Sequence, residues 1–553
     1  MLTRRLLAVA LVVVLPRLLA AQTPLLDSLN ALSSLLQDVK VKKDEYFQEL
    51  TFDQQEPYRL QLTITEVDRK GREEQVRYDF NLGLMSPRRV RYEDGRNRLI
   101  VSVESAGGSA VKEYEDGEFE GYNDNAYFLA ANIDNARDIQ RTLKAMIPLA
   151  KERWETDNTL PEDYEGLSAW IQQAVRDIAV DGETWDQKWI PDAAYPNRVA
   201  LEQVEDGEEA YRYAWNLADV NPSSVDVDAS GKTVTVEMGI KSREDFVRVE
   251  EDGILDDYES SVSLQFAEID DAQLAANALR RLAKLAAEAE EANPITYNSR
   301  ADAREALAAT LTNFQREDET ITQRISGECQ MTYERVVEEE GEEEAYLYAF
   351  DFADINPRSV EIDVSRTELF VVAELKGGED YVYTEENGEQ EDYEDEVSFA
   401  VEDIPKAKRV RQQIIKMAED CPDETAVQDY AWIQEALQSI DEEKEELSQS
   451  LSLMEGDECK WVLTRFEEGR NDTDELRYEF NLYDLDDRGA ELDVSGTTVT
   501  VEIPTVKDEE IIKLYTNDEE VEYEDELEFV LKDIADGKAF VASLKAMIEA
   551  CRE

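Results

Sequence analysis

The sequence contains no histidine and only four cysteines in 553 residues. Without histidine, Ser-His-Asp triads and Cys-His nucleophile pairs are excluded, and the commonest metal ligand is missing. A glycine-rich phosphate loop is missing too, because the Gly-Gly pairs at 107–108 and 377–378 stand alone. Histidine-dependent catalysis and phosphate-loop nucleotide binding are therefore excluded.

Catalysis by paired carboxylates is the chemistry that remains, since a glycosidase needs only two of them. The chain has 129 Asp and Glu residues, so acidic pairs arise by chance and carry little information. A catalytic acid would also have to break the pattern shared by the repeats described below, and none stands out. We expect a non-catalytic protein without a cofactor and keep a glycosidase-like hydrolase as an alternative.

Long apolar runs are confined to the N-terminus. Two arginines precede an apolar stretch at residues 6–14, and the small residues Ala20 and Ala21 follow. The stretch is too short to span a bilayer core and is followed closely by Pro16. We predict a signal peptide over residues 1–21, cleaved near Ala21, and a periplasmic or extracellular mature protein that does not insert into membranes.

Basic residues are scarce: 58 Lys and Arg stand against 129 acids, a formal net charge of −71. The first 21 residues carry three arginines and no acid, so their removal leaves −74. This charge excludes a binder of nucleic acid or of anionic membranes, because phosphate contacts require a basic face. Hydrophobic residues make up 42% of the chain, which favours folded domains over disorder.

The acidic residues are spread over the whole mature chain, and only 22 of the 58 basic residues are lysine. Self-repulsion destabilises such a protein, but at about 1 M salt the Debye length falls to roughly 3 Å. Evenly acidic, lysine-poor surfaces resemble those of proteins from extreme halophiles. We expect adaptation to high salt, with generic cations as counter-ions. The alternative is a dedicated binder of calcium or of a basic partner.

A five-residue motif, Tyr-x-(Phe/Trp)-x-(Leu/Phe), occurs four times. Its central aromatics are Phe80, Trp215, Phe350 and Phe480, which are 135, 135 and 130 residues apart. The alternation places the apolar side chains on one face of a strand. The period predicts four tandem copies of one unit: repeat 1 (22–153), repeat 2 (160–290), repeat 3 (297–421) and repeat 4 (425–553).

Each copy continues with further alternating strands, a Tyr-acid turn and a closing amphipathic helix, and another helix precedes the strands. The tyrosines of the turn are Tyr122, Tyr258, Tyr393 and Tyr523. The unit is predicted to be α+β: a helix, about six antiparallel strands and a C-terminal helix. Short strands closed by one helix resemble a pleckstrin-homology-type barrel, but an open sheet explains the pattern equally well.

The four cysteines form two pairs with one spacing. Cys329 and Cys421 are 92 residues apart, as are Cys459 and Cys551, and the second member of each pair ends a closing helix. In repeat 2 both corresponding positions are alanine, at 194 and 286, which indicates that the two positions touch. In an exported protein this favours disulfides over free thiols or a metal site. We predict bridges 329–421 and 459–551, each joining the start of a first strand to the closing helix.

The tryptophans are unevenly distributed, with five of the seven in or just before the first half of repeat 2. Trp185, Trp189 and Tyr195 lie in or just after residues 183–191, a segment without an evident match in the other copies. The segment is either a local core beneath a longer loop or an aromatic platform for a protein or carbohydrate partner. The second interpretation makes these three the candidate ligand-binding residues.

Residues 484–489 begin like an EF-hand loop, but Arg488 stands at a ligand position and Ser495 at the twelfth. Corresponding turns in repeats 2 and 3 contain Asn-Pro, which favours an ordinary strand connection, so no metal ligand is predicted. The sequence predicts an exported, non-catalytic tandem-repeat protein that binds or scaffolds an unknown ligand in high salt. The alternatives are the glycosidase-like hydrolase and a specific calcium-binding protein.

Overall fold

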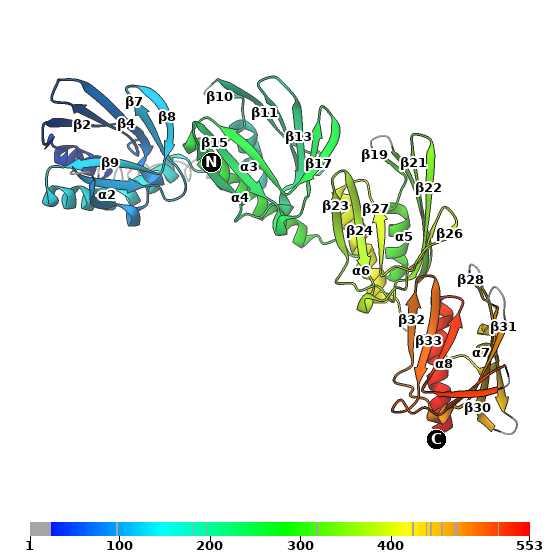
Figure 1. The fold of residues 1–553 in the computed structure, drawn as a ribbon. Helices are drawn as coiled ribbons and strands as arrows, with labels where there is room; N and C mark the ends of the chain where they lie inside the picture. Colours follow the sequence, from blue (N-terminus) through cyan, green and yellow to red (C-terminus); the bar gives the residue numbers. More distant parts are fainter. Residues whose placement is uncertain are drawn as a thin grey trace, which may run out of the picture. The chain divides into compact units, whose positions relative to one another are not determined.

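The computed structural model describes residues 24–552, apart from 96–97, 181, 196, 317–318, 423–424, 438–439, 443–444, 455–456, 469–472 and 518. The predicted signal peptide lies outside the described residues. The chain divides into two compact units, Met1–Pro294 and Ile295–Glu553. Each unit contains two copies of one α+β fold (Figure 1), which confirms the four tandem repeats.

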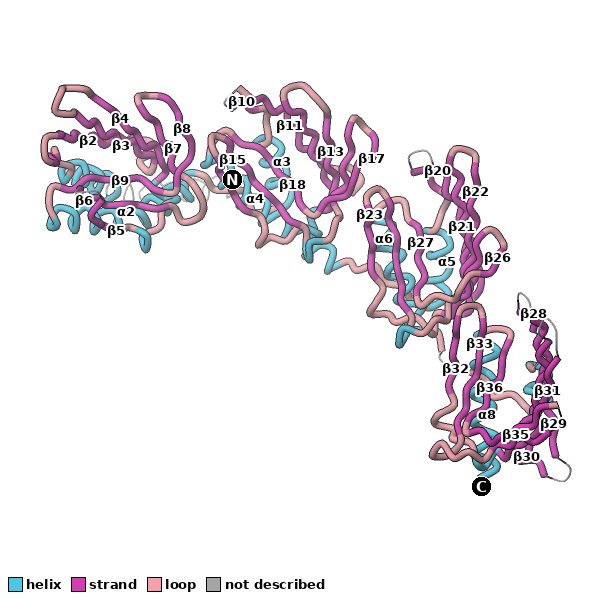
Figure 2. The backbone as a smooth tube through the Cα atoms, viewed as in Figure 1, coloured by secondary structure: helices cyan, strands magenta, loops and turns pink. Residues whose placement is uncertain are grey.

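Within the described residues, every repeat contains nine antiparallel strands in two sheets (Figure 2). In repeat 1 the strand orders are β1-β2-β3-β4-β7-β8 and β5-β6-β9, and the other repeats reproduce both orders strand for strand. None of these sheets closes into a barrel in the part of the chain that the structure describes. The open-sheet alternative is therefore supported, and a three-stranded sheet is added to it.

The first unit contains repeats 1 and 2, whose elements correspond in chain order. In repeat 1 a helix at 24–35 precedes β1 (Val39–Val41), β2 (Asp44–Phe52), β3 (Arg59–Val67), β4 (Glu73–Asn81), β5 (Arg91–Gly95), β6 (Arg98–Glu104), β7 (Val111–Glu115), β8 (Glu118–Asn123), β9 (Asn125–Ala130) and α2 (Ile133–Asp157). Repeat 2 comprises α3 (Tyr164–Ala174), β10 (Ile178–Val180), β11 (Glu183–Pro191), β12 (Arg198–Glu205), β13 (Ala210–Asn216), β14 (Asp226–Ser230), β15 (Thr233–Gly239), β16 (Val247–Glu251), β17 (Ile254–Glu259), β18 (Ser261–Phe266) and α4 (Ile269–Ala292).

The second unit contains repeats 3 and 4, built in the same order. Repeat 3 comprises α5 (Arg300–Thr310), β19 (Phe314–Arg316), β20 (Glu319–Gly327), β21 (Gln330–Glu339), β22 (Glu342–Asp351), β23 (Glu361–Ser365), β24 (Glu368–Glu374), β25 (Tyr383–Glu386), β26 (Glu389–Gln390), β27 (Glu396–Ala400) and α6 (Ile404–Asp420). Repeat 4 comprises α7 (Tyr430–Ala436), β28 (Ile440–Glu442), β29 (Glu445–Met454), β30 (Asp457–Glu468), β31 (Thr473–Asn481), β32 (Glu491–Ser495), β33 (Thr498–Pro504), β34 (Ile512–Thr516), β35 (Glu519–Glu524), β36 (Glu526–Leu531) and α8 (Ile534–Arg552).

The core of a repeat lies between its two sheets and its helices. In repeat 2, α4 contacts the three-stranded sheet, and α3 contacts both α4 and β11 of the six-stranded sheet. Trp189, Leu201 and Trp215 of the large sheet share one buried cluster with Val236 of the small sheet and Leu279 of α4. The aromatic motif found in the sequence thus supplies core residues.

Short side chains fix where several helices begin. The residues before α3, α5, α6 and α7 each accept a hydrogen bond from the backbone N–H three residues on; they are Asp163, Ser299, Asp403 and Asp429. Such caps satisfy backbone donors that a helix leaves unpaired at its first turn.

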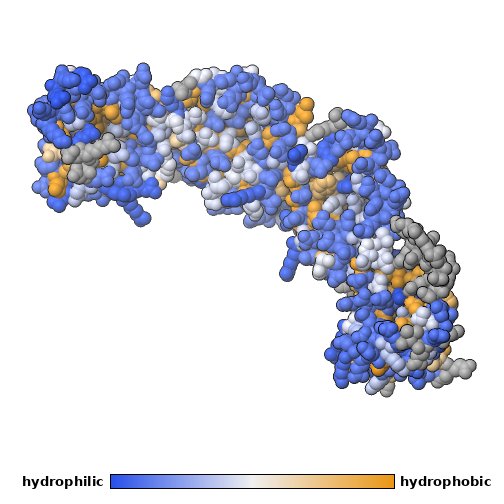
Figure 3. Space-filling view, viewed as in Figure 1, coloured by the Kyte–Doolittle hydropathy of each residue, from blue (hydrophilic) through white to orange (hydrophobic). Residues whose placement is uncertain are grey.

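The surface is mainly polar on the face shown in Figure 3, where apolar side chains form small separate groups. In the described part of the chain, no helix combines the length and the apolar character needed to cross a bilayer.

Both predicted disulfides are confirmed, with Cα–Cα distances of 5.7 Å for Cys329–Cys421 and 5.8 Å for Cys459–Cys551. Each bridge begins at the third strand of its repeat, because Cys329 directly precedes β21 and Cys459 lies in β30. The expectation that each bridge begins at a first strand was wrong. In repeat 3 the strands β19 and β20 come before β21, and in repeat 4 the strands β28 and β29 come before β30.

The counterpart of Cys329 in repeat 2 is Asn197 rather than Ala194. Both Asn197 and Cys329 accept, through their carbonyls, a hydrogen bond from the backbone two residues after the aromatic anchor. The hairpin between β12 and β13 is shorter than that between β21 and β22, so counting back from the anchor gave the wrong residue. Nδ2 of Asn197 donates to the carbonyl of Ala286 at 3.4 Å, which puts a hydrogen bond in place of the disulfide.

Candidate functional site

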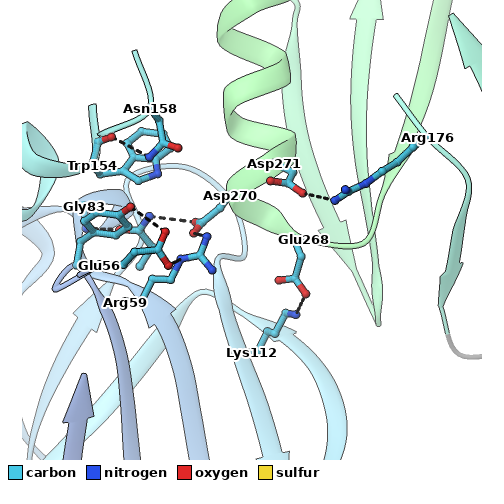
Figure 4. Close-up of polar contacts among 12 residues, drawn as sticks. Glu56, Arg59, Gly83, Lys112, Trp154, Asn158, Arg176, Glu268, Asp270 and Asp271 are labelled. Carbon is cyan, nitrogen blue, oxygen red and sulfur yellow. Dashed lines mark hydrogen bonds and ion pairs between the residues drawn. The ribbon is translucent and has the colours of Figure 1, made fainter. Parts of the chain in front are cut away.

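Repeats 1 and 2 meet at a polar contact around the start of α4, which we call the first junction (Figure 4). Asp270 is buried there, and its Oδ1 accepts a hydrogen bond from Nδ2 of Asn81 at 3.0 Å. Its Oδ2 lies 3.3 Å from the guanidinium of Arg59. Asn81 is itself oriented, because its Oδ1 accepts from the backbone N–H of Gly83 at 2.8 Å. A carboxylate of repeat 2 is thus held by two side chains of repeat 1.

Burial raises the pKa of Asp270 above its ordinary value, while the hydrogen bond from Asn81 and the charge of Arg59 act in the opposite direction. A buried carboxylate that loses its partners is strongly destabilising. The junction therefore depends on Arg59 and Asn81 together with the acid.

Tyr122 of repeat 1 makes two hydrogen bonds to backbone carbonyls of repeat 2 in the first junction. Its N–H donates to the carbonyl of Gly231 at 2.8 Å, and its hydroxyl donates to the carbonyl of Ala267 at 3.3 Å. Gly121 has a φ of +145°, and a Cβ at this residue would lie 2.7 Å from the Gly231 oxygen. Glycine suits this close approach because it accepts the positive φ and brings no Cβ toward the Gly231 oxygen.

Lys112 adds a second ion pair to the first junction. Its Nζ lies 2.7 Å from a carboxylate oxygen of Glu268 and 5.7 Å from the centre of the Tyr122 ring. Ile269, the first residue of α4, is buried beside this pair. In the first junction repeat 1 supplies the bases and repeat 2 supplies the acids.

Repeats 3 and 4 form a second junction with the same backbone contact and reversed charges. The N–H of Tyr393 donates to the carbonyl of Gly496 at 3.1 Å, and Tyr393 belongs to the buried cluster of repeat 4. Here the base is Lys538 of α8, which pairs with Asp354 of repeat 3 and lies 4.7 Å from the Tyr381 ring centre. Reversed charges disfavour exchange of partners between the two junctions.

The structure places the three predicted ligand-binding residues in different environments. Trp189 is buried, with its ring 5.4 Å from that of Trp215, and Trp185 lies four residues earlier on the same strand, partly buried. Tyr195 is exposed in the following loop, and the Arg198 guanidinium lies 4.2 Å from its ring centre. Among the described residues no ring contact joins any two of the three, and ligand binding by them stays a prediction.

Residues 183–191 do have counterparts in the other repeats. They form β11, the second strand of the six-stranded sheet, at the place that β2, β20 and β29 have in their repeats. The interpretation of an unmatched segment was wrong, because the residue types differ although the place of the strand in the sheet is the same. Trp189 stands where Leu50 and Leu451 stand, all three buried.

The fifth residue of each of these second strands is glutamine, which the sequence analysis missed. These sheet-joining glutamines are Gln48, Gln187, Gln323 and Gln449. The sequence feature that could have revealed them is a glutamine at the same strand position in all four copies. Hairpins of unequal length hide it, because its spacing from the aromatic anchor varies.

The sheet-joining glutamines connect the large sheet to the last strand of the small sheet. Nε2 of Gln449 donates to the carbonyl of Val530 at 2.7 Å, and its Oε1 accepts from the N–H of the same residue at 3.2 Å. Repeats 1 and 2 contain the same pair of bonds. In repeat 3 the Tyr333 hydroxyl mediates, since it donates to Gln323 at 2.8 Å and accepts from the N–H of Ala400 at 3.3 Å.

Three repeats place a glutamate directly after the tyrosine of the Tyr-acid turn. Burial raises the pKa of Glu259, Glu394 and Glu524, and neighbouring acids add to the shift. A group repeated in three copies does not mark one copy as catalytic, so these carboxyls do not favour the hydrolase.

The loop that begins like an EF-hand is engaged in protein contacts. Oδ1 of Asp486 accepts from the N–H of Arg488 at 3.1 Å, and Asp487 pairs with Arg552 of α8. Within the described ranges, no group of three or more His, Cys, Asp or Glu side chains is placed to hold a metal ion.

An open pocket of about 400 Å³ lies in repeat 3 between α5 and the ends of β20 and β21. Ala308, Ile325 and Met331 contribute apolar surface to it, and Arg304 and Glu305 lie at its lining. Arg304 lies 3.5 Å from a carboxylate oxygen of Glu328 on the surface.

The chain matches no protein-family model, no curated protein and no solved structure.

Proposed function

We propose that this chain is an exported, non-catalytic tandem-repeat protein that binds or scaffolds a macromolecular partner and is adapted to high salt. The supporting observation is the presence of four copies of one fold, docked in pairs through charge-specific junctions. Linked copies present several similar surfaces, and linkage strengthens weak contacts by raising the effective concentration.

Two observations support export. The N-terminus has the arrangement of charged, apolar and small residues that signal peptidases recognise. Both disulfides close spans of 92 residues in repeats 3 and 4, and structural disulfides persist in oxidising compartments outside the cytoplasm.

Crowded acids support salt adaptation. Glu502 and Glu526 lie on the paired strands β33 and β36, and the pKa of each is raised by burial and by other acids nearby. Burial is the larger cause, and the added contribution of the neighbouring acids reflects repulsion between ionised carboxylates on these strands. Molar salt would screen that repulsion.

A salt series tests the adaptation. The purified mature protein should lose cooperative tertiary structure as salt falls from molar to about 10 mM, where the Debye length reaches roughly 30 Å. Near-ultraviolet circular dichroism and thermal melting follow the loss. A melting temperature that does not change over this range would contradict salt adaptation and favour a specialised acidic binder.

A retention experiment tests the binding function. The immobilised mature protein is exposed to native envelope extract in molar salt, which suppresses generic charge attraction. We expect a protein or glycan to be retained in a saturable way, and an unrelated acidic protein of similar charge density serves as control. Retention of the same molecules by both would contradict the proposal. A Tyr195→Ala variant tests the exposed candidate residue.

A further inference from the structure

Repeats 4 and 1 each present one exposed half of a junction. Tyr523 occupies the position of Tyr122 and Tyr393 but is 44% exposed, whereas each of those tyrosines is 7% exposed. Ile133 at the start of α2 occupies the position of Ile269 and is 54% exposed, against 7% for Ile269. Side chains that are covered in the two junctions are therefore exposed at the corresponding positions of repeats 4 and 1.

Strand register shows that Tyr523 is the counterpart of Tyr122. Across β34 and β35, Tyr523 is paired with Lys513. Lys112 and Tyr122 have the same pairing across β7 and β8. Repeat 4 thus carries the lysine–tyrosine pair that repeat 1 uses against repeat 2. Glu522 takes the place of Gly121, as an acid also does in the second junction.

The side chains that hold Asp270 also have counterparts in repeat 4. Arg59 is paired with Asn81 across β3 and β4, and Lys460 is paired with Asn481 across β30 and β31. Oδ1 of Asn481 accepts from the backbone N–H two residues on, at 3.1 Å, which is the orienting bond of Asn81. Lys460 is partly exposed and lies 3.1 Å from Asp457 on the surface.

Repeat 1 carries the acid that this set would hold. Asp134 follows Ile133 in α2, at the place that Asp270 has in α4. Its side chain is 90% exposed, and it lies 3.3 Å from Arg137 in the same helix. The acid is not a general feature of the repeat, because Pro405 takes this place in α6.

We propose that a second copy of this chain docks head to tail, with the Tyr523 face of repeat 4 covering Ile133 of the next copy. Lys460 and Asn481 of one copy then hold Asp134 of the other, as their counterparts hold Asp270 in the first junction. One chain carries both the side chains that would hold the acid, on repeat 4, and the acid itself, on repeat 1. The partner that fits each of these two surfaces is therefore a second copy of the chain. Such a heterologous contact continues from copy to copy unless a ring closes.

Sedimentation velocity of the full mature protein in molar salt tests the docking. The weight-average mass should rise with protein concentration. Tyr523→Ser and Ile133→Ser should each weaken association by about tenfold or more, the scale for removing an anchor at the centre of an interface. Both residues are exposed, so the fold should be retained. Ile254→Ser, at an exposed position of β17, is the matched control and should associate like the unaltered protein.

A mixture of the two variants gives the sharper result. Each variant keeps one intact face. At a protein concentration where each variant alone is monomeric, an equimolar mixture should therefore form one-to-one dimers and nothing larger. A wild-type protein that stays monomeric at every concentration would overturn the proposal. Association that survives both substitutions, or a mixture that forms larger species, would also overturn it.

Discussion

The side-chain amide of Gln187 hydrogen-bonds both backbone groups of Gln265, a residue 78 positions later in the chain. Nε2 donates to the carbonyl at 2.9 Å, and Oε1 accepts from the N–H at 2.9 Å. This is the pair of bonds that an antiparallel strand would make. One side chain therefore continues the hydrogen bonding of the small sheet at β18, which is an edge strand of that sheet in the described part of the chain.

Replacing Gln187 by leucine should destabilise repeat 2. The substitution leaves the N–H and the carbonyl of Gln265 without this partner, at a cost of about 1–3 kcal/mol for each group if water does not replace it. Chemical denaturation followed by tryptophan fluorescence measures the change. Gln173→Leu on the exposed side of α3 is the control and should change stability by about 0.5 kcal/mol or less. Equal effects of the two substitutions would contradict the bridging role.

Repeat 2 should accept a third disulfide at Asn197 and Ala286. The double variant N197C/A286C closes a span of 89 residues, which contributes about 4–5 kcal/mol in the chain-entropy model. Peptide mapping without reductant identifies the bond, and denaturation with and without reductant measures its effect. The variant A194C/A286C should not form this bridge, because residue 194 is not the counterpart of Cys329. A bridge in the second variant only would refute the structural alignment.

Asp270 should make the first junction more stable at mildly acidic pH. Its pKa is raised in the folded state, so the folded protein binds this proton more tightly than the unfolded chain does. The contribution is complete below the unfolded pKa and is lost as pH rises through the folded pKa. Asp270→Asn should flatten the dependence of melting temperature on pH above about 4. Asp271→Asn, at a partly exposed carboxylate paired with Arg176, should preserve it.

Reversing one charge of the second junction should weaken it, and reversing both should restore it. Lys538→Glu places two acids together at a partly buried site and should cost about 2 kcal/mol, the scale of a hydrogen bond to a charged group. Addition of Asp354→Lys should recover most of the loss in denaturation experiments. Lys284→Glu, at an exposed pair on α4, is the control with little expected effect. If the double variant does not regain the lost stability, the interaction between Lys538 and Asp354 does not stabilise the junction.

The sequence predicts the repeats well because core positions alternate strongly. Tyr213, Trp215 and Leu217 carry a period-two pattern that survives exchange of one aromatic residue for another. The equal spacing of the two cysteine pairs predicted both disulfides correctly. Ala194 was misassigned because the hairpin after β12 is shorter than its counterpart, which no single sequence pattern reveals.

The junctions were beyond prediction from the sequence. Asp270 is one of 129 acids, and its partner Asn81 lies 189 residues away. Nothing local distinguishes this carboxylate from its solvated neighbours. Asp270 joins the two repeats because it is buried between them, and this burial depends on how the repeats dock.

The disulfides give the two halves of the chain different extensibility under tension. An extended chain spans about 3.3–3.6 Å per residue, so a bridge that closes a 92-residue span withholds on the order of 300 Å of contour length. Repeats 1 and 2 contain no cysteine and would stretch out fully once unfolded. A pull on both ends would therefore draw length mainly from residues 24–294, while repeats 3 and 4 stay short until their bridges are reduced.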